Sequence, residues 1–212
     1  WDVDYKYVLG RFKSKKLMET KGYPVSRWID GVLLKKNEIA LQDTNTRAMV
    51  FWGHAPNSQS RLKEMRTALE KLDLLLIIDP HPNLASVLSN RKDGTYLLPA
   101  ASQFETYGSV TASNRSLQWR DKVFEPYFEA KPDHTIMYLM AKKLGFSKQM
   151  FKNIKVKGEE PLVEDLTREF NRGMWTIGYT GQSPERLRMH MKNQHTFDRT
   201  SLRANGGPAD GE

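Results

Sequence analysis

The run Ala48-Met49-Val50-Phe51-Trp52-Gly53, with the run Leu74-Leu75-Leu76-Ile77-Ile78-Asp79 downstream of it, decides the fold of this chain. Each run is continuously apolar and stops at a glycine or an aspartate, which is typical of short strands buried in a parallel sheet. Between them, Ser60 is a candidate helix cap, and apolar residues follow at helical spacing: Leu62, Met65, Leu69 and Leu72. The order strand, helix, strand predicts a βαβ unit with a right-handed crossover.

Weaker patterns extend this unit in both directions. A short helix is expected within residues 83–90, and a third strand at residues 96–98 that Pro99 closes. Asp133 is expected to cap a helix that stops at Gly145 and carries Ile136, Met137, Met140 and Leu144. The remaining segments are interpreted as loop and extended chain (residues 108–119), helices (161–174 and 184–192), and extended or disordered chain from His195 onward.

These patterns predict an α/β fold with a parallel sheet of Rossmann-like βαβ units and a mainly helical C-terminal extension. Three parts are expected along the chain. Residues 1–45 form a helical or irregular lead-in, in which Tyr7, Val8, Phe12, Leu17 and Met18 line one helical face. Residues 46–146 form the α/β core that binds a dinucleotide cofactor, and residues 147–212 form a helical extension with a flexible polar tail.

The composition excludes several classes of function. The 212 residues include no cysteine, so this chain alone builds no thiolate metal site, iron–sulfur cluster, disulfide or cysteine nucleophile. No apolar run approaches the roughly eighteen residues that a transmembrane helix needs, so we expect no direct membrane insertion. The sequence starts at Trp1 rather than at a methionine and ends in a polar tail. We therefore expect an internal segment of a longer protein, with any targeting signal outside it.

The formal net charge of +8, from 33 Lys and Arg against 25 Asp and Glu, favours a polyanionic partner. That partner is either a nucleic acid or a phosphate-bearing cofactor, and the alternative is a solvated basic surface. The basic clusters at residues 13–16 and 152–157 are not interleaved with the aromatic residues that a single-strand binder uses for stacking. Nucleic acid is therefore the less favoured partner.

The candidate site lies where the two strands end, because ligands of parallel α/β sheets bind beyond the carboxyl ends of the strands. Gly53 allows close backbone approach, and Asn57 and Ser58 offer hydrogen bonds to a phosphate or diphosphate. Asp79 can accept hydrogen bonds from a guanine or from ribose hydroxyls. The alternative reading is a plain βα turn followed by a turn-forming Asp-Pro, because the loop lacks both Gly-x-Gly-x-x-Gly and a phosphate-loop lysine.

Other chemistry finds little support in the sequence. The five histidines show no metal-ligand spacing, although His54 and His81 both follow strand ends and could approach the same ligand. No nucleophile and base are arranged as in a hydrolase, and Ser109 and Ser113 are not in a Gly-x-Ser-x-Gly elbow. No catalytic residue and no metal ligand is therefore assigned to this chain.

Four stretches together resemble one region of the molybdopterin oxidoreductases: residues 50–58, 76–80, 96–99 and 104–115. The shared pattern is strand–Gly–loop, strand–Asp, a Leu-Leu-Pro strand, then Glu105-x-x-Gly108 with a variant of Asn-x-x-Arg after it. Residues 169–182 are similar to the major subunit of respiratory formate dehydrogenases in particular. The resemblance covers residues 47–207 and is specific as a run.

The resemblance implies a bis(molybdopterin guanine dinucleotide) cofactor with molybdenum or tungsten, in a selenoprotein family of anaerobic respiration that oxidises formate to carbon dioxide. It also implies that six residues contact one guanine dinucleotide arm: Gly53, His54, Ile78, Asp79, Thr106 and Asp133. Some relatives have lysine at the position of Thr106. It also implies that the metal ligands lie in other segments, so that this chain alone is inactive. The implied partners are the rest of the large subunit and an iron–sulfur electron-transfer subunit, and the implied location is the periplasm.

Two alternatives stay open at this point. The chain is also compatible with another molybdopterin oxidoreductase, of the nitrate or polysulfide reductase type. A different class is a stand-alone nucleotide- or nucleic-acid-binding module, which would bind oligonucleotides with a steep salt dependence and no preference for guanine.

Overall fold

The structure is a computed structural model, and it describes Lys6, Pro56 and residues 24–35, 44–54, 60–111, 117–173 and 183–193. The expected helical face at residues 7–18, the loop residues Asn57 and Ser58, and the chain from His195 lie outside these residues. The chain divides into two compact units. We call residues 2–100 the sheet unit and residues 101–212 the helical unit.

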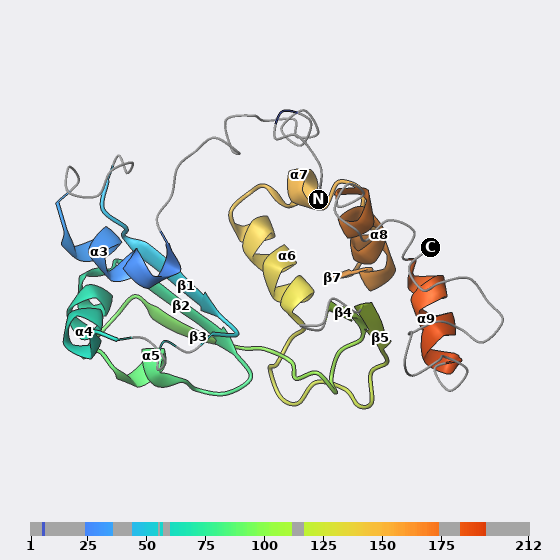
Figure 1. The fold of residues 1–212 in the computed structure, drawn as a ribbon, viewed down its shortest axis with the longest axis horizontal. Helices are drawn as coiled ribbons and strands as arrows, with labels where there is room; N and C mark the ends of the chain where they lie inside the picture. Colours follow the sequence, from blue (N-terminus) through green and yellow to red (C-terminus); the bar gives the residue numbers. More distant parts are fainter. Residues whose placement is uncertain are drawn as a thin grey trace. The chain divides into compact units, whose positions relative to one another are not determined.

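The sheet unit contains the predicted parallel sheet (Figure 1). Its elements follow the order η1 (Val25–Arg27), α3 (Trp28–Leu33), β1 (Ala48–Trp52), α4 (Leu62–Lys71), β2 (Leu74–Asp79), α5 (Leu84–Val87) and β3 (Thr95–Pro99). The strands lie in the order β1-β2-β3, and both pairs are parallel, with Phe51 opposite Ile77 and Ile77 opposite Leu97. The mixed α/β class and the βαβ unit are therefore confirmed.

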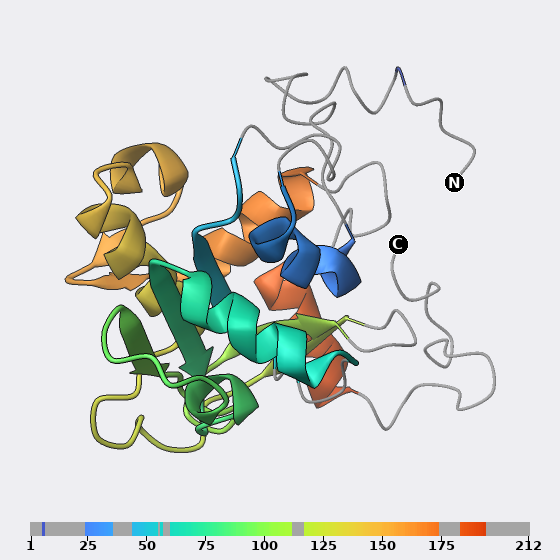
Figure 2. The ribbon, with the colours of Figure 1, turned by 90° about the vertical axis from the view of Figure 1, so that its left-hand side faces the viewer.

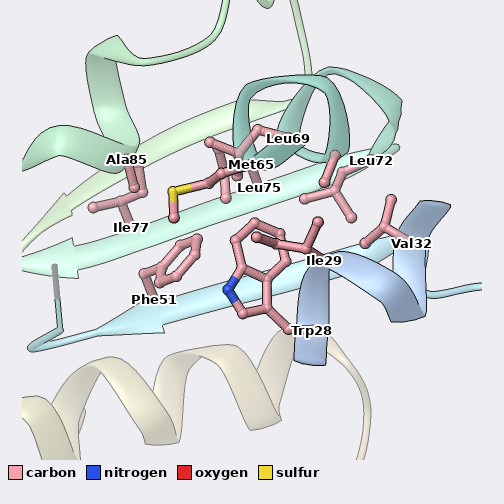
Figure 3. Close-up of a cluster of buried hydrophobic side chains, with 11 residues drawn as sticks. Trp28, Ile29, Val32, Phe51, Met65, Leu69, Leu72, Leu75, Ile77 and Ala85 are labelled. Atoms are coloured by element: carbon pink, nitrogen blue, oxygen red, sulfur yellow. The ribbon is translucent and has the colours of Figure 1, made fainter. Parts of the chain in front are cut away.

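One hydrophobic core stabilises this unit (Figure 3). Helices α3 and α4 lie side by side (Figure 2). Their apolar side chains pack in one cluster with those of the sheet. Trp28 packs edge-on against Phe51, with ring centroids 5.7 Å apart, and Ile29 is 1% exposed. Each such buried side chain contributes about 1.5–3 kcal/mol, so residues 24–35 are an integral layer of this core.

The start of α4 differs from the prediction. Ser60 does not cap the helix; the cap position is Arg61, which has a left-handed backbone and makes no side-chain cap. Arg61 instead binds Glu64 in the first turn and the buried Asp30 of α3, at 2.7 Å. The hydrogen bond from Arg61 lowers the pKa of Asp30. Leu62 is half exposed, so the buried face of α4 is formed by Met65, Ala68 and Leu69.

The helical unit contains two antiparallel hairpins and four helices among its described residues. The first hairpin is β4 (Gly108–Thr111) with β5 (Leu117–Arg120), and the second is β6 (Val156–Lys157) with β7 (Glu160–Pro161). The helices are α6 (Asp133–Lys143), α7 (Ser147–Met150), α8 (Val163–Gly173) and α9 (Pro184–Lys192). The sequence patterns predicted neither hairpin, whereas α9 has the expected bounds and α8 begins two residues later than expected. No described helix is long and apolar enough to cross a bilayer.

The expected cap of α6 is also corrected. The cap position is Pro132, and Asp133 is the first residue of the helix itself. Its carboxylate still lies in the first turn, where negative charge is favourable. The helix ends as predicted, because Gly145 has a left-handed φ of 82°. The buried residues are Thr135, Ile136 and Ala141, whereas Met137 and Leu144 are exposed, so only part of the expected apolar stripe faces the interior.

A small core joins α8 and α9 to the first hairpin. It consists of Trp119, Val163 and Leu187, with Tyr107 and Leu117 packed against them. The guanidinium of Arg188 lies 4.2 Å from the centre of the Trp119 ring and binds Glu164 at 2.6 Å. This stacked ion pair fixes α9 against β5.

Candidate functional site

The carboxyl ends of β1 and β2 lie next to each other, as the site hypothesis requires. Trp52 is paired with Ile78, and the amide of Gly53 donates a hydrogen bond to the carbonyl of Ile78 at 2.8 Å. Gly53 and Asp79 are therefore the first residues past this paired position on two adjacent parallel strands. His54 follows Gly53 and is exposed, so the structure brings four of the predicted residues to one edge of the sheet.

Gly53 leaves room for a ligand at this edge because it has no side chain, but it offers no free backbone N–H. Its φ of 57° lies in the left-handed region, where a side chain is disfavoured. A Cβ built at this position would meet no atom of the described residues within 4 Å, so on their side the backbone is open to a ligand. Its amide hydrogen is already used by Ile78.

Asp79 is half buried and holds the chain that follows β2. Its Oδ1 accepts from the amide of His81 at 3.0 Å, and its Oδ2 accepts from the side-chain amide of Asn83 at 3.2 Å. Asn83 in turn caps α5 by accepting from the amide of Ala85. A carboxylate has about four acceptor positions, so these two bonds leave capacity for two donors of a ligand. No basic side chain is bound to Asp79 among the interactions of the described residues.

The other two predicted residues, Thr106 and Asp133, lie in the helical unit beside one pocket. The pocket has a volume of about 480 Å³. Thr106 lines it, and Asp133 lies between two lining residues, Pro132 and His134. The remaining walls come from the loops around the first hairpin and from the second hairpin: Glu105, Tyr107, Lys122, Glu125, Pro126, Lys155, Val156, Lys157, Glu160, Pro161 and Leu162.

The residues around the pocket carry charges of both signs, and burial shifts the pKa of two titratable groups in its wall. Burial lowers the pKa of His134, so its imidazole is neutral at pH 7, and burial raises the pKa of Tyr107. Lys122 is paired with Glu125 at 2.6 Å. Lys155 and Lys157 also line the pocket, together with Glu105, Glu125 and Glu160. Such a wall supplies hydrogen-bond donors to an anionic or polar ligand.

Glu105, the acid of the Glu-x-x-Gly pattern, has a structural role in this wall. It is 6% exposed, and its two oxygens accept from the amides of Ser102 and Tyr127, each at 2.7 Å. The hydrogen bond from the Ser102 amide and that from the Tyr127 amide lower the pKa of Glu105. Gly108 of the same pattern allows close packing, because a Cβ there would lie 2.7 Å from the Val163 side chain.

Sequence reasoning missed the contribution of the second hairpin to the pocket. The basic cluster at residues 152–157 was visible, but the strand that places Lys155 and Lys157 on one wall is only two residues long. The alternation of lysines around Val156 was the one available signal. Among the described residues, no group of three or more histidine, aspartate or glutamate side chains could hold a metal ion.

Comparison with known proteins identifies related sequences. A family model described as "Molybdopterin oxidoreductase" matches residues 18–143. The alpha subunit of formate dehydrogenase 2 (cytochrome c-553) from Nitratidesulfovibrio vulgaris is 34% identical over 36% of this chain and 8% of that protein. The probable oxidoreductase YjgC of Bacillus subtilis is 33% identical over 41% of this chain and 8% of its own length. A trimethylamine-N-oxide reductase from Vibrio vulnificus is 30% identical over 59% of this chain and 16% of its own length. The match thus spans a small part of each relative.

Proposed function

Because this chain belongs to the molybdopterin oxidoreductase family, we propose that it is an internal segment of a formate dehydrogenase large subunit. In this proposal the segment holds one guanine dinucleotide arm of a bis(molybdopterin guanine dinucleotide). The family implies a molybdopterin cofactor with molybdenum or tungsten, which when bound supplies the two-electron step from formate to carbon dioxide. The residues of this chain bind and orient one arm and take no part in that step.

The adjacency of Gly53 and Asp79 at one edge of the sheet carries this proposal. In the proposed site, the open side of Gly53 admits the arm close to the backbone, and His54 lies at its edge. The Ile78 carbonyl belongs to the ladder that fixes this geometry. Asn57 and Ser58 of the connecting loop are proposed to bind the diphosphate.

Asp79 is proposed to select guanine. A carboxylate is an acceptor only, and guanine presents two adjacent donors, N1–H and the exocyclic amine. Adenine has an acceptor at N1, which would face the carboxylate oxygen without a proton between them. A hydrogen bond to a charged group contributes about 1.5–3 kcal/mol, so the preference for guanine should reach at least about tenfold. Thr106 and Asp133 of the helical unit are also proposed to contact the cofactor, and Thr106 lines the 480 Å³ pocket of that unit.

The proposal includes partners that the chain needs for activity. The matched segments make up 8% to 16% of the relatives, and in this proposal the metal ligands and iron–sulfur cysteines lie elsewhere in the same large subunit. Electrons then pass to iron–sulfur clusters and an iron–sulfur subunit, at a periplasmic location, in an enzyme of anaerobic respiration. The isolated chain is expected to have no formate dehydrogenase activity.

Reduction of an oxidised substrate is a second candidate. The trimethylamine-N-oxide reductase match covers 59% of this chain, against 36% for the formate dehydrogenase 2 subunit of Nitratidesulfovibrio vulgaris. The resemblance of residues 169–182 to formate dehydrogenases supports the first candidate. Formate oxidation and amine-oxide reduction assayed on the complete subunit would separate the two.

Calorimetric titration of the chain with GDP and with ADP tests the binding proposal. GDP should bind at least about tenfold more tightly than ADP, and Asp79→Asn should remove that preference because its amide turns a donor toward the guanine donors. Asp73→Asn is the matched control, because Asp73 precedes the same strand at its opposite end and binds Arg47. Equal binding of GDP and ADP by the unmodified chain would contradict the assignment of Asp79.

A further inference from the structure

The helical unit presents an unusual group of apolar side chains to solvent. Four aromatic residues and one valine lie on two neighbouring loops, and we call them the aromatic ledge: Phe104 (51% exposed), Val123 (71%), Phe124 (39%), Tyr127 (64%) and Phe128 (103%). Their rings form one continuous series. Centroid distances are 6.4 Å from Phe104 to Phe124, 5.4 Å from Phe124 to Tyr127, and 6.4 Å from Tyr127 to Phe128. Contiguous exposed apolar surface of this kind marks an interaction site.

The ledge is held in place by hydrogen bonds of its own backbone. The amides of Val123 and Phe124 both donate to the carbonyl of Phe104, at 2.8 and 3.3 Å. The buried carboxylate of Glu105 accepts from the amide of Tyr127 at 2.7 Å, and the amide of Ala130 donates to the Tyr127 carbonyl. The rings therefore stand on a defined backbone before any partner arrives, which lowers the entropy lost on binding.

Phe128 is the most informative residue of the ledge. Its φ of 52° lies in the left-handed region, which a bulky side chain rarely adopts and which a glycine would occupy without strain. Its side chain is fully exposed and so returns no burial energy to the fold that holds it. A strained backbone that presents an unburied ring points to a contact outside this unit.

We propose that the aromatic ledge docks against an apolar surface of the remaining part of the large subunit, an inference that rests on the proposed function. The relatives are many times longer than the matched segment, so most of their polypeptide is available to cover this surface. A permanent contact within one polypeptide keeps the rings out of water, whereas a transient partner would leave them exposed and prone to aggregation.

The charges next to the ledge argue against polyanionic occupants. Residues 121–131 contain three acidic side chains and two basic ones, and Lys122 is already paired with Glu125. A nucleic acid would need a cationic groove beside the stacking rings, and an anionic membrane would need basic flanks. An apolar protein surface needs neither of these features.

Hydroxyl-radical footprinting with mass spectrometry tests the inference by comparing the 212-residue chain with the complete large subunit that carries it. Tyr127 and Phe128 should be modified rapidly in the isolated chain and at least about tenfold more slowly in the complete subunit. Equal rates in the two samples would overturn the inference. So would protection that appears only on dimerisation or only after the iron–sulfur subunit is added.

A pair of variants gives a second readout that does not depend on footprinting. Phe128→Gly removes both the strain and the ring, so it should raise the melting temperature of the isolated chain and lower that of the complete subunit. Leu144→Ala is the matched control, because Leu144 is 69% exposed on a right-handed backbone, and it should shift neither. A Phe128→Gly variant that shifts both proteins in the same direction would overturn the inference. Guanine dinucleotide content of the same subunit reports separately on the proposed function, because the ledge can be covered whether or not Asp79 binds guanine.

Discussion

Gly53→Ala separates the two roles that the structure gives to this glycine. An L side chain in the left-handed region costs about 1–2 kcal/mol, so the variant should unfold at lower urea concentration. The added Cβ meets no atom within 4 Å in the part of the chain that the structure describes, so no clash with that part adds to this cost. The same methyl group would fill the open side of the strand end, and GDP affinity should fall at least about tenfold, which corresponds to about 1.4 kcal/mol.

Gly145→Ala is the matched control for backbone strain. Gly145 has a φ of 82°, and a Cβ there also meets nothing within 4 Å, but it follows α6 in the other unit. It should lose a similar free energy of unfolding and keep its GDP affinity. Urea denaturation and calorimetric GDP titration of both variants provide the comparison. Equal GDP affinities of Gly53→Ala and Gly145→Ala, whether both are unchanged or both are reduced, would contradict the binding role of Gly53.

Three further predictions concern stability. Trp28→Ala should destabilise the sheet unit by about 3–5 kcal/mol in urea denaturation, because it empties a fully packed site in the core, and an unchanged midpoint would show that α3 is not part of that core. Gly94→Ala should cost more than Gly145→Ala in the same assay, because its Cβ would lie 2.4 Å from the Asp73 carbonyl oxygen in addition to the strain of a φ of 65°; equal losses would contradict this. The folded-state pKa of Glu105 lies below its ordinary value of 4.5, so its ionised carboxylate stabilises the fold above pH 4.5. This contribution is lost as the pH falls through the lower, folded-state pKa. Glu105→Gln should therefore flatten the curve of unfolding free energy against pH in this acidic range.

The strands of the sheet unit were predictable because their apolar runs are unbroken and end at a glycine or an aspartate. Ala48–Trp52 and Leu74–Asp79 pair in a parallel sheet, as their apolar runs predict, but the expected burial holds for β2 better than for β1, in which only Phe51 is buried. The adjacency of Gly53 and Asp79 then followed from topology alone. The start of α4 was not predictable from local rules, because Arg61 finds its partner Asp30 thirty-one residues earlier in the sequence.

The hairpins and the pocket were not predictable, since short strands with exposed residues carry little hydrophobic signal. Val156–Lys157 has two residues, and it lines the same pocket as Thr106, which lies about fifty residues earlier in the sequence. The aromatic ledge shows the opposite problem. Its composition at residues 123–128 suggests a buried segment, and only the three-dimensional structure shows that these side chains face solvent.

The most direct test of the central claim is a heteronuclear NMR titration of the isotopically labelled chain with GDP. The amide resonances of Gly53, His54, Asp79 and His81 should shift most, because these residues share the carboxyl edge of the sheet. Resonances of Asp73 and Gly94, at the opposite edge, should stay in place. Shifts concentrated at that opposite edge, or a saturated complex in which Gly53 and Asp79 do not move, would contradict that claim.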